Sequence, residues 1–330
     1  MSYDISKTKL EKFFLFSLGS KKFGYGHYNR LESLISIIRN KNRKFFHYSL
    51  GENIKDKNKF IKQLEYKIES GSKVILDFTN PLFLNDKTVI RLKKILNKKK
   101  QAKIYVIDSP VKKNLTFTLN LKGIKTLIPF EVGNDIKKKC IKIKQVNFGL
   151  KYFIFSKKSL KKKNKLYDIV ISFGGSDNYK GTLYVLSLMQ YLEIKKKVLV
   201  VIGKYFNKNY KKKIFSVCEK KNFSTISFSK NFSNILNKSR LLITNSGLTK
   251  YEGFFLGLPV LVFSDNSKCE KIDQMFVNKT KQFQFSYLKN LHKDILKLKR
   301  ILNMKLDLKK VEKNILKSNI QNIKDFFLND

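Results

Sequence analysis

The chain of 330 residues contains no tryptophan, 3 cysteines, and 25 acidic residues against 70 basic ones. The cysteines (Cys140, Cys218 and Cys269) are far apart and odd in number, so they form no metal-binding pattern and predict free thiols in a reducing cytoplasm. Charged residues interrupt every apolar run well before the roughly 18–20 residues that a membrane-spanning helix needs. The apolar run from Phe13 to Leu18 is short and follows acidic residues, so no signal peptide is expected.

The formal net charge of +45 suggests an anionic partner, such as nucleic acid or a membrane surface. Lysine runs nevertheless occur in every part of the chain, each where a helix end or a loop is expected. We therefore interpret them as solvated surface and expect no nucleic-acid partner, while a weak peripheral attraction to an anionic membrane stays open. The runs are Lys98–Lys100, Lys137–Lys139, Lys161–Lys163, Lys195–Lys197 and Lys211–Lys213.

The first half of the chain alternates β-rich runs with amphipathic segments, a pattern typical of βαβ units and a parallel sheet. A hydrophobic content of 42% is enough for one large domain or two ordinary ones. The predicted strands are Phe13–Ser17, Lys44–Tyr48, Lys73–Phe78, Lys103–Ile107 and Thr126–Ile128, and the predicted helices are His27–Arg39, Lys57–Glu69 and Lys87–Asn97.

The second half repeats this alternation and continues from Tyr287 as one or two lysine-rich amphipathic helices. A polar, lysine-rich stretch from Phe155 to Tyr167 separates the halves. We therefore predict domains at 1–155 and 156–330, each with an open parallel sheet, and a ligand cleft between them. The strands predicted here are Ile169–Phe173, Val198–Ile202, Thr225–Phe228, Leu241–Thr244 and Val260–Phe263, and the helices are Thr182–Tyr191, Asn209–Lys220, Phe232–Asn237 and Thr249–Leu256.

The segment Gly174-Gly175-Ser176-Asp177 follows a predicted strand and precedes a predicted helix. Such a turn directs free backbone N–H groups and the positive end of a helix dipole at one small volume. Glycine lets a ligand approach the main chain closely because it lacks a Cβ. A phosphate is the ligand that this arrangement favours, and an ordinary strand–helix turn with a Ser/Asp cap is the alternative.

The segment Gly24-Tyr25-Gly26-His27 opens a helical pattern after the first predicted strand. A histidine at a helix N-terminus tends to stay neutral near pH 7 and can then accept a proton from water. The neighbouring glycines leave room for the ring, so we favour a catalytic His27 over a packing histidine. We expect His47, within a strand, to be structural and His292, within the last helices, to be solvated.

A second small-residue turn, Ser246-Gly247-Leu248-Thr249, follows the strand that ends at Thr244. Its amides are predicted to hold further phosphate oxygens. Glu252 lies one turn into the next helix, where a carboxylate can accept hydrogen bonds from a ribose diol. The alternative for Glu252 is a surface glutamate favoured by the helix dipole.

These segments, in this order, resemble a known family, the UDP-sugar hydrolases of the pseudaminic acid pathway. Gly24-x-Gly26-His27-x-x-Arg30 is similar to the opening motif of that family, and Gly174-Gly175-Ser176-Asp177 matches its Gly-Gly-Ser-Asp turn. Gly149-x-x-Tyr152, Thr249-x-Tyr251-Glu252 and Leu256-Gly257-Leu258-Pro259 resemble three further segments, so the resemblance covers residues 13–265.

The resemblance implies a GT-B glycosyltransferase-like α/β fold of two Rossmann-type domains. It also implies metal-independent hydrolysis, without a cofactor, of UDP-2,4-diacetamido-2,4,6-trideoxy-β-L-altropyranose. His27 then assists the water, both turns hold the pyrophosphate, and Glu252 binds the ribose. The residues expected to contact the sugar are Gly26, Arg30, Asp77, Asp108 and Tyr152.

The sequence departs from the family at the second turn, where Leu248 replaces a hydroxyl residue, and after two strands, at Asp77-Phe78-Thr79 and Asp108-Ser109. Nucleotide binding is therefore better supported than the identity of the sugar. Two alternatives stay open: a GT-B glycosyltransferase that uses an acceptor hydroxyl in place of water, and a non-catalytic binder of nucleotide sugars or polyanions.

Overall fold

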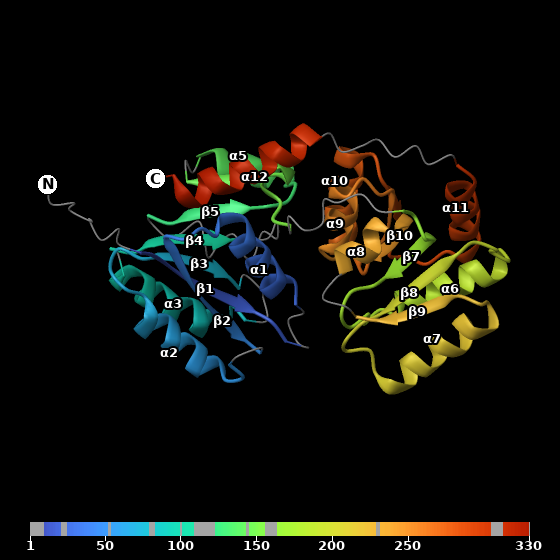
Figure 1. Ribbon diagram of the computed structural model, residues 1–330, viewed down its shortest axis with the longest axis horizontal. Helices are drawn as coiled ribbons and strands as arrows, with labels where there is room; N and C mark the ends of the chain where they lie inside the picture. The colour runs from blue at the N-terminus through green and yellow to red at the C-terminus, as the bar shows by residue number, and fades with distance from the viewer. Residues whose placement is uncertain are drawn as a thin grey trace, which may run out of the picture. The chain divides into compact units, whose positions relative to one another are not determined.

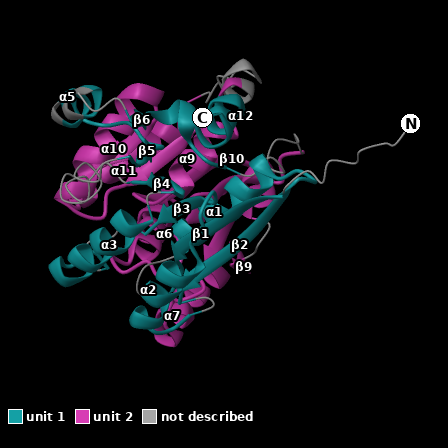
Figure 2. Cartoon of the chain, turned by 90° about the vertical axis from the view of Figure 1, so that its left-hand side faces the viewer, with its two compact units in different colours: residues 1–156, 319–330 teal, residues 157–318 magenta. Residues whose placement is uncertain are grey.

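A computed structural model of the chain describes residues 10–20, 25–51, 54–78, 83–99, 101–108, 123–142, 145–155, 164–228, 232–304 and 313–329. The chain divides into two compact units (Figure 2). The first unit is Met1–Ser156 together with Asn319–Asp330, and the second is Lys157–Ser318.

The first unit contains a six-stranded parallel sheet in the order β2-β1-β3-β4-β5-β6 (Figure 1). Parallel neighbours need crossover connections, and helices between the strands supply them. The strands are β1 (Glu11–Leu18), β2 (Arg43–Leu50), β3 (Lys73–Asp77), β4 (Lys103–Ile107), β5 (Lys125–Ile128) and β6 (Val146–Phe148). The helices are α1 (Gly26–Ile38), α2 (Lys57–Lys67), α3 (Asp86–Lys98), α5 (Asn134–Lys142) and the short 3-10 helix η1 (Leu150–Tyr152).

Both faces of this sheet are covered, which explains why β1 is a nearly continuous apolar run. Because successive side chains of a strand point to opposite faces, Phe14 and Phe16 pack with residues of α2 and α3, whereas Phe13 and Leu15 pack with α1. The five strands and three helices predicted for this half are confirmed to within three residues at their ends. The short elements β6, α5 and η1 were not predicted.

The final helix, α12 (Lys313–Leu328), ends in the first unit. Its side chains Ile323, Phe326 and Phe327 join the core layer that also contains α1. Lys73 donates from Nζ to the carbonyl oxygen of Phe327 at 3.0 Å, so a cation satisfies the helix C-terminus. The sequence predicts that all residues after 155 belong to the second domain. The structure instead places Asn319–Asp330 in the first unit, because their apolar face completes its core.

The second unit has its own six-stranded parallel sheet in the order β12-β11-β10-β7-β8-β9. The strands are β7 (Tyr167–Ser172), β8 (Val198–Ile202), β9 (Ser224–Ser227), β10 (Ser239–Asn245), β11 (Val260–Phe263) and β12 (Phe283–Phe285). The helices are α6 (Gly181–Tyr191), α7 (Lys208–Lys220), α8 (Phe232–Asn237), α9 (Thr249–Phe255), α10 (Ser267–Thr280) and α11 (Leu291–Asn303).

The predicted elements of this half are confirmed, while α10 and β12 were missed. The lysine-rich segment after Tyr287 forms α11 and α12, as predicted. Across the ranges that the structure describes, no helix combines the length and the apolar composition of a membrane span. The two parallel sheets flanked by helices match the predicted fold class.

Candidate functional site

The carboxyl end of the first sheet is polar on the face that α1 covers. Ser17 of β1 pairs with Ser49 of β2 and with Asp77 of β3, and all three side chains are fully buried. Residues paired across neighbouring strands point to the same face, so these three side chains form a row. We call Ser49, Ser17 and Asp77 the polar row. The same face is apolar nearer the start of β1, at Phe13 and Leu15.

Three side chains meet at the Asp77 end of the polar row. His27, the second residue of α1, places Nδ1 2.6 Å from Oδ1 of Asp77. Arg30, one turn further along α1, donates from Nε to Oδ2 at 2.7 Å and from Nη2 to Oδ1 at 2.6 Å. The imidazole of His27 is 14% exposed, whereas Asp77 is inaccessible, so the ring can reach a ligand while its partner cannot.

Asp77 remains a carboxylate in this buried position. Burial by itself raises the pKa of Asp77, but the charges of Arg30 and His27 and their hydrogen bonds outweigh burial and hold it below its usual range. A carboxylate oxygen only accepts hydrogen bonds, so Nδ1 of His27 carries the hydrogen. Nε2 is then the nitrogen with the lone pair in the neutral ring, which is the nitrogen that a general base uses.

The other predicted residues of the first unit are more dispersed. Gly26 is the first residue of α1, and Asp108 follows β4 as a fully buried carboxyl whose main-chain N–H donates to Leu127. Tyr152 donates from its hydroxyl to Asn147 at 3.0 Å and packs its ring against Phe326 of α12. These contacts make Tyr152 part of the packing of α12 and not of the His27 cluster. Gly24, Thr79 and Ser109 lie outside the described residues.

In the second unit, the predicted glycine turn follows β7. Gly174 has φ 71°, a conformation that favours glycine. Gly203, at the end of β8, packs under this turn: a Cβ there would lie 2.4 Å from the carbonyl oxygen of Gly174 and 2.5 Å from that of Gly175. Within the described residues, the N–H groups of Gly174 and Gly175 have no hydrogen-bond acceptor. The turn therefore offers two free donors.

Asp177 has a structural role that the sequence analysis considered only as an alternative. Its carboxylate accepts from the N–H groups of Gly181 at 2.7 Å and Thr182 at 2.9 Å, and from the hydroxyl of Tyr210 at 2.5 Å. It therefore caps the first turn of α6, whose amides are used internally. Ser176 lies in the turn between Asp177 and the two free amides of the glycine turn.

The second turn follows β10, the strand next to β7. Asn245 is the last residue of β10, and its Oδ1 lies 4.0 Å from the position that a Cβ on Gly174 would occupy. The two turns are therefore neighbours. Leu248 precedes the first residue of α9, Thr249, and no described side chain caps this helix. Among the described residues, the N–H groups of Leu248 and Thr249 find no acceptor, whereas that of Gly247 donates to Asn245 at 3.3 Å.

A buried ion pair that was not predicted supports the second turn. Lys250 is 1% exposed, and its Nζ lies 2.5 Å from Oδ1 of Asp273 and 3.0 Å from the carbonyl oxygen of Ser246. Ser246 and Ser264 donate to the other oxygen of Asp273, at 2.6 Å and 2.8 Å. The only sequence signal was a lysine inside an otherwise small and apolar motif, and nothing in the sequence linked it to Asp273.

Two carboxyl groups near this turn have raised pKa values. Burial raises the pKa of Glu252 to about 7, and no ion pair or hydrogen bond to its side chain is present in the described residues. Burial, with the negative charges of Asp273 and Asp177, raises the pKa of Asp265 to about 7. Asn245 donates to Asp265 at 3.3 Å. A poorly solvated carboxyl group without a protein donor, such as Glu252, is suited to bind a ligand hydroxyl.

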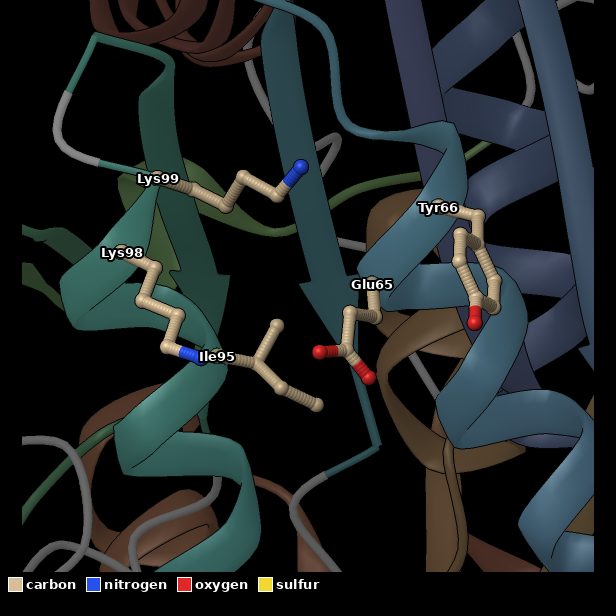
Figure 3. A pocket seen from close by; sticks show the side chains of 5 residues that line it. All are labelled: Glu65, Tyr66, Ile95, Lys98 and Lys99. Atoms are coloured by element: carbon tan, nitrogen blue, oxygen red, sulfur yellow. The ribbon is translucent and has the colours of Figure 1, made fainter.

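The first unit has a surface hollow of about 340 Å³ between α2 and α3, which is lined by Glu65, Tyr66, Ile95, Lys98 and Lys99 (Figure 3). None of the predicted site residues lines it. Its helices cover the sheet face opposite α1. In the part of the chain that the structure describes, no group of three or more His, Cys, Asp or Glu side chains is placed to hold a metal ion.

Comparison with known sequences finds one curated relative and no matching protein-family model. The relative, uncharacterized protein MJ1062 from Methanocaldococcus jannaschii, is 27% identical in an alignment of 312 positions that covers 81% of this chain. The chain spans only 60% of the length of that relative.

Solved structures similar to this chain include Acinetobacter baumannii MurG, with a TM-score of 0.60 and 9% identity over 96% of this chain and 99% of the other. The UDP-GlcNAc 2-epimerase of Methanocaldococcus jannaschii has a TM-score of 0.58 and 14% identity over 95% and 98%. Anabaena Alr3699/HepE, solved with UDP-glucose, has a TM-score of 0.51 and 11% identity over 95% of both chains. The chain therefore has a GT-B-like α/β fold.

Proposed function

We propose that this protein is a metal-independent UDP-sugar hydrolase. It releases UDP and a 2,4-diacetamido-2,4,6-trideoxyhexose for pseudaminic acid biosynthesis. The observation on which the proposal depends is the partly exposed imidazole of His27 held by the buried carboxylate of Asp77. Similarity to a UDP-GlcNAc 2-epimerase and to a protein solved with UDP-glucose supports a UDP-sugar as the ligand.

His27 acts as the general base in this proposal. Water attacks the anomeric carbon, its proton passes to Nε2, and the bond between that carbon and the diphosphate oxygen breaks with its electrons leaving on UDP. Asp77 holds the Nδ1–H tautomer and stabilises the imidazolium that forms. A positioned base of this kind contributes roughly 10²–10⁴-fold to the rate.

The two turns of the second unit stabilise the leaving diphosphate. The N–H groups of Gly174, Gly175, Leu248 and Thr249, which have no acceptor among the described residues, are fixed donors for phosphate oxygens. Leu248 lacks the hydroxyl of the family motif, but its amide is the group that the proposal needs. Ser176 and Gly247 shape these turns, and Ser246 connects the second turn to Asp273.

Glu252 binds the ribose diol, because its carboxylate is poorly solvated and has no hydrogen-bond donor in the part of the chain that the structure describes. Asp77 and Arg30 position His27 instead of contacting the sugar, since both oxygens of Asp77 are already used. We assign the sugar to Gly26 in the first unit, because the carboxyl group of Asp108 is as inaccessible as that of Asp77. Tyr152 supports the packing of α12, and Asp177 supports the glycine turn as a helix cap.

The test is release of UDP from UDP-2,4-diacetamido-2,4,6-trideoxy-β-L-altropyranose by the purified protein without an acceptor, compared with His27→Ala and with His292→Ala as the matched control. We expect turnover in the parent and in His292→Ala, and loss of at least 10²-fold in His27→Ala. Equal rates in the parent and His27→Ala contradict the assigned base. UDP release that requires an added acceptor identifies a glycosyltransferase instead.

A further inference from the structure

Within the described residues, no side chain caps the N-terminus of α1, which presents His27. Its capping position is Tyr25, which makes no side-chain hydrogen bond to the helix, and the first turn contains no acidic residue. Uncapped first turns fray, because their N–H groups have no intrahelical partner. Something outside the helix must therefore fix the turn on which the proposed base lies.

His47 of β2 contacts this part of α1 at two points. Its ring stacks on Tyr28, with ring centroids 4.8 Å apart and planes at 18°, and Tyr28 in turn meets Tyr25 edge-on at 6.1 Å. One turn further, Oε1 of Glu32 lies 2.6 Å from Nδ1 of His47. Two successive turns of α1 are thus attached to one imidazole.

The opposite edge of the same ring contacts the polar row. Nε2 of His47 lies 2.8 Å from Oγ of Ser17, and Ser17 pairs across the sheet with Asp77, the partner of His27. The hydrogen bond from His47 lowers the pKa of Glu32, so Glu32 is a carboxylate and Nδ1 of His47 carries the hydrogen. His47 therefore connects Tyr28, which follows His27 in the sequence, to Ser17, which pairs with Asp77 across the sheet.

We propose that His47, held between Glu32 and Ser17, is a positioning residue that fixes the ring orientation and tautomer of His27. The inference rests on the proposed role of His27 as a base. His47 does not contact the ligand; it acts by holding Tyr28 and Glu32, and with them the first turns of α1, against the sheet. A base that shifts by about 1 Å loses roughly 10²-fold in rate, so this support matters for turnover more than for binding.

The test uses the small number of histidines. The chain has 3, His27, His47 and His292, so ¹⁵N-histidine labelling gives few ring signals to assign. Ring-nitrogen shifts distinguish protonated from unprotonated nitrogen and therefore report the tautomer of His27. In His47→Gln at a fixed neutral pH, we expect the Nδ1 and Nε2 shifts of His27 to move toward those of a tautomer mixture. The control, His292→Gln on the exposed part of α11, leaves the His27 shifts unchanged.

A second variant tests the same inference if His47→Gln does not fold. Glu32→Ala removes the acceptor of His47 from a half-exposed position on α1, where alanine favours the helix. We expect the same direction of change at His27. Unchanged His27 ring shifts in a folded His47→Gln or Glu32→Ala protein overturn the inference.

A kinetic measurement separates positioning from general stability. With UDP-sugar, His47→Gln should lower kcat roughly 10- to 100-fold and leave KM within about twofold, at a temperature at which the parent and the variant are both folded. An unchanged kcat also overturns the inference. If the parent hydrolyses no UDP-sugar, the proposed function fails, and the ring shifts still decide whether His47 positions His27.

Discussion

The ammonium group of Lys250 and the carboxylate of Asp273 lie 2.5 Å apart, both inaccessible to solvent, directly beneath the turn of residues 246–249. Lys250 also donates to the carbonyl oxygen of Ser246, and Asp273 accepts from the hydroxyl of Ser246. The pair thus fixes one residue of the turn from both sides. Its cost of burial is offset only while both partners and their hydrogen bonds are present.

Replacing one partner of this pair should destabilise the protein strongly. Lys250→Met leaves the buried carboxylate of Asp273 without its cation, which we expect to lower the free energy of unfolding by about 3–5 kcal/mol. Chemical denaturation of Lys250→Met and of Lys250→Met with Asp273→Asn measures this. The double variant should recover much of the loss, and a single variant as stable as the parent contradicts the buried ion pair.

Asp77→Asn should reduce hydrolysis by roughly 10²- to 10⁴-fold, because an amide does not fix the Nδ1–H tautomer of His27. It also leaves the charge of Arg30 unpaired, so the variant is less stable at neutral pH. The pKa of Asp77 is lowered in the folded protein, so its stabilising effect is present above the ordinary value of 3.8 and fades as the pH falls through the folded value. Denaturation curves should therefore show the parent and variant converging in acid.

The raised pKa of Glu252 predicts that protein stability depends on pH in the opposite direction. Its folded pKa of about 7 exceeds the ordinary value of 4.5, so between these values the folded protein binds more protons than the unfolded chain. The free energy of unfolding should fall as the pH rises through this window. In Glu252→Gln this fall should be smaller, because the amide does not titrate. The variant should nevertheless bind UDP about tenfold more weakly, because the amide is a poorer acceptor for the ribose diol. Thermal midpoints against pH and calorimetric titration with UDP check both statements.

Gly203→Ala should displace the glycine turn although Gly203 is not proposed to touch the ligand. Its new Cβ would lie within 2.5 Å of two carbonyl oxygens of the turn, and backbone must move to accept it. We expect a lower thermal midpoint and a smaller stabilisation by UDP. Gly175→Ala is the contrast, because its Cβ would meet Tyr205 at an ordinary contact distance of 3.6 Å, so the fold should persist while UDP binding weakens. Equal UDP affinity in all three proteins contradicts a ligand at this turn.

The elements with strong periodicity were predictable from the sequence, because β1 and β7 are apolar runs and α3 has a clear apolar face. The helix α10 and the strand β12 were missed, since α10 is mainly polar and β12 has three residues. The fold class followed from the alternation of strands and helices. The return of α12 to the first unit did not, because its apolar face does not specify which sheet it covers.

The candidate residues were easier to predict than their partners. His27 was found from local glycines, but Asp77 is 50 positions away, and only the register of β1 with β3 brings it under α1. The same limit hid His47, whose partners Ser17 and Glu32 lie on two other elements. Asp177 shows the reverse problem, because one carboxylate next to glycines suits a phosphate turn and a helix cap equally well in sequence.

The packing of Phe326 and Phe327 on Tyr105 sets the order in which the chain can fold during synthesis. The strands of the first sheet all precede those of the second in the sequence, yet the core layer beneath α1 lacks Phe326 and Phe327 until residues after Asn319 have been synthesised. The core of the first unit is thus completed only after the second sheet has been synthesised. A nascent chain stalled before Asn319 should expose Tyr105 and Ile107 to chaperones and proteases, even though the whole of the second sheet has already been made.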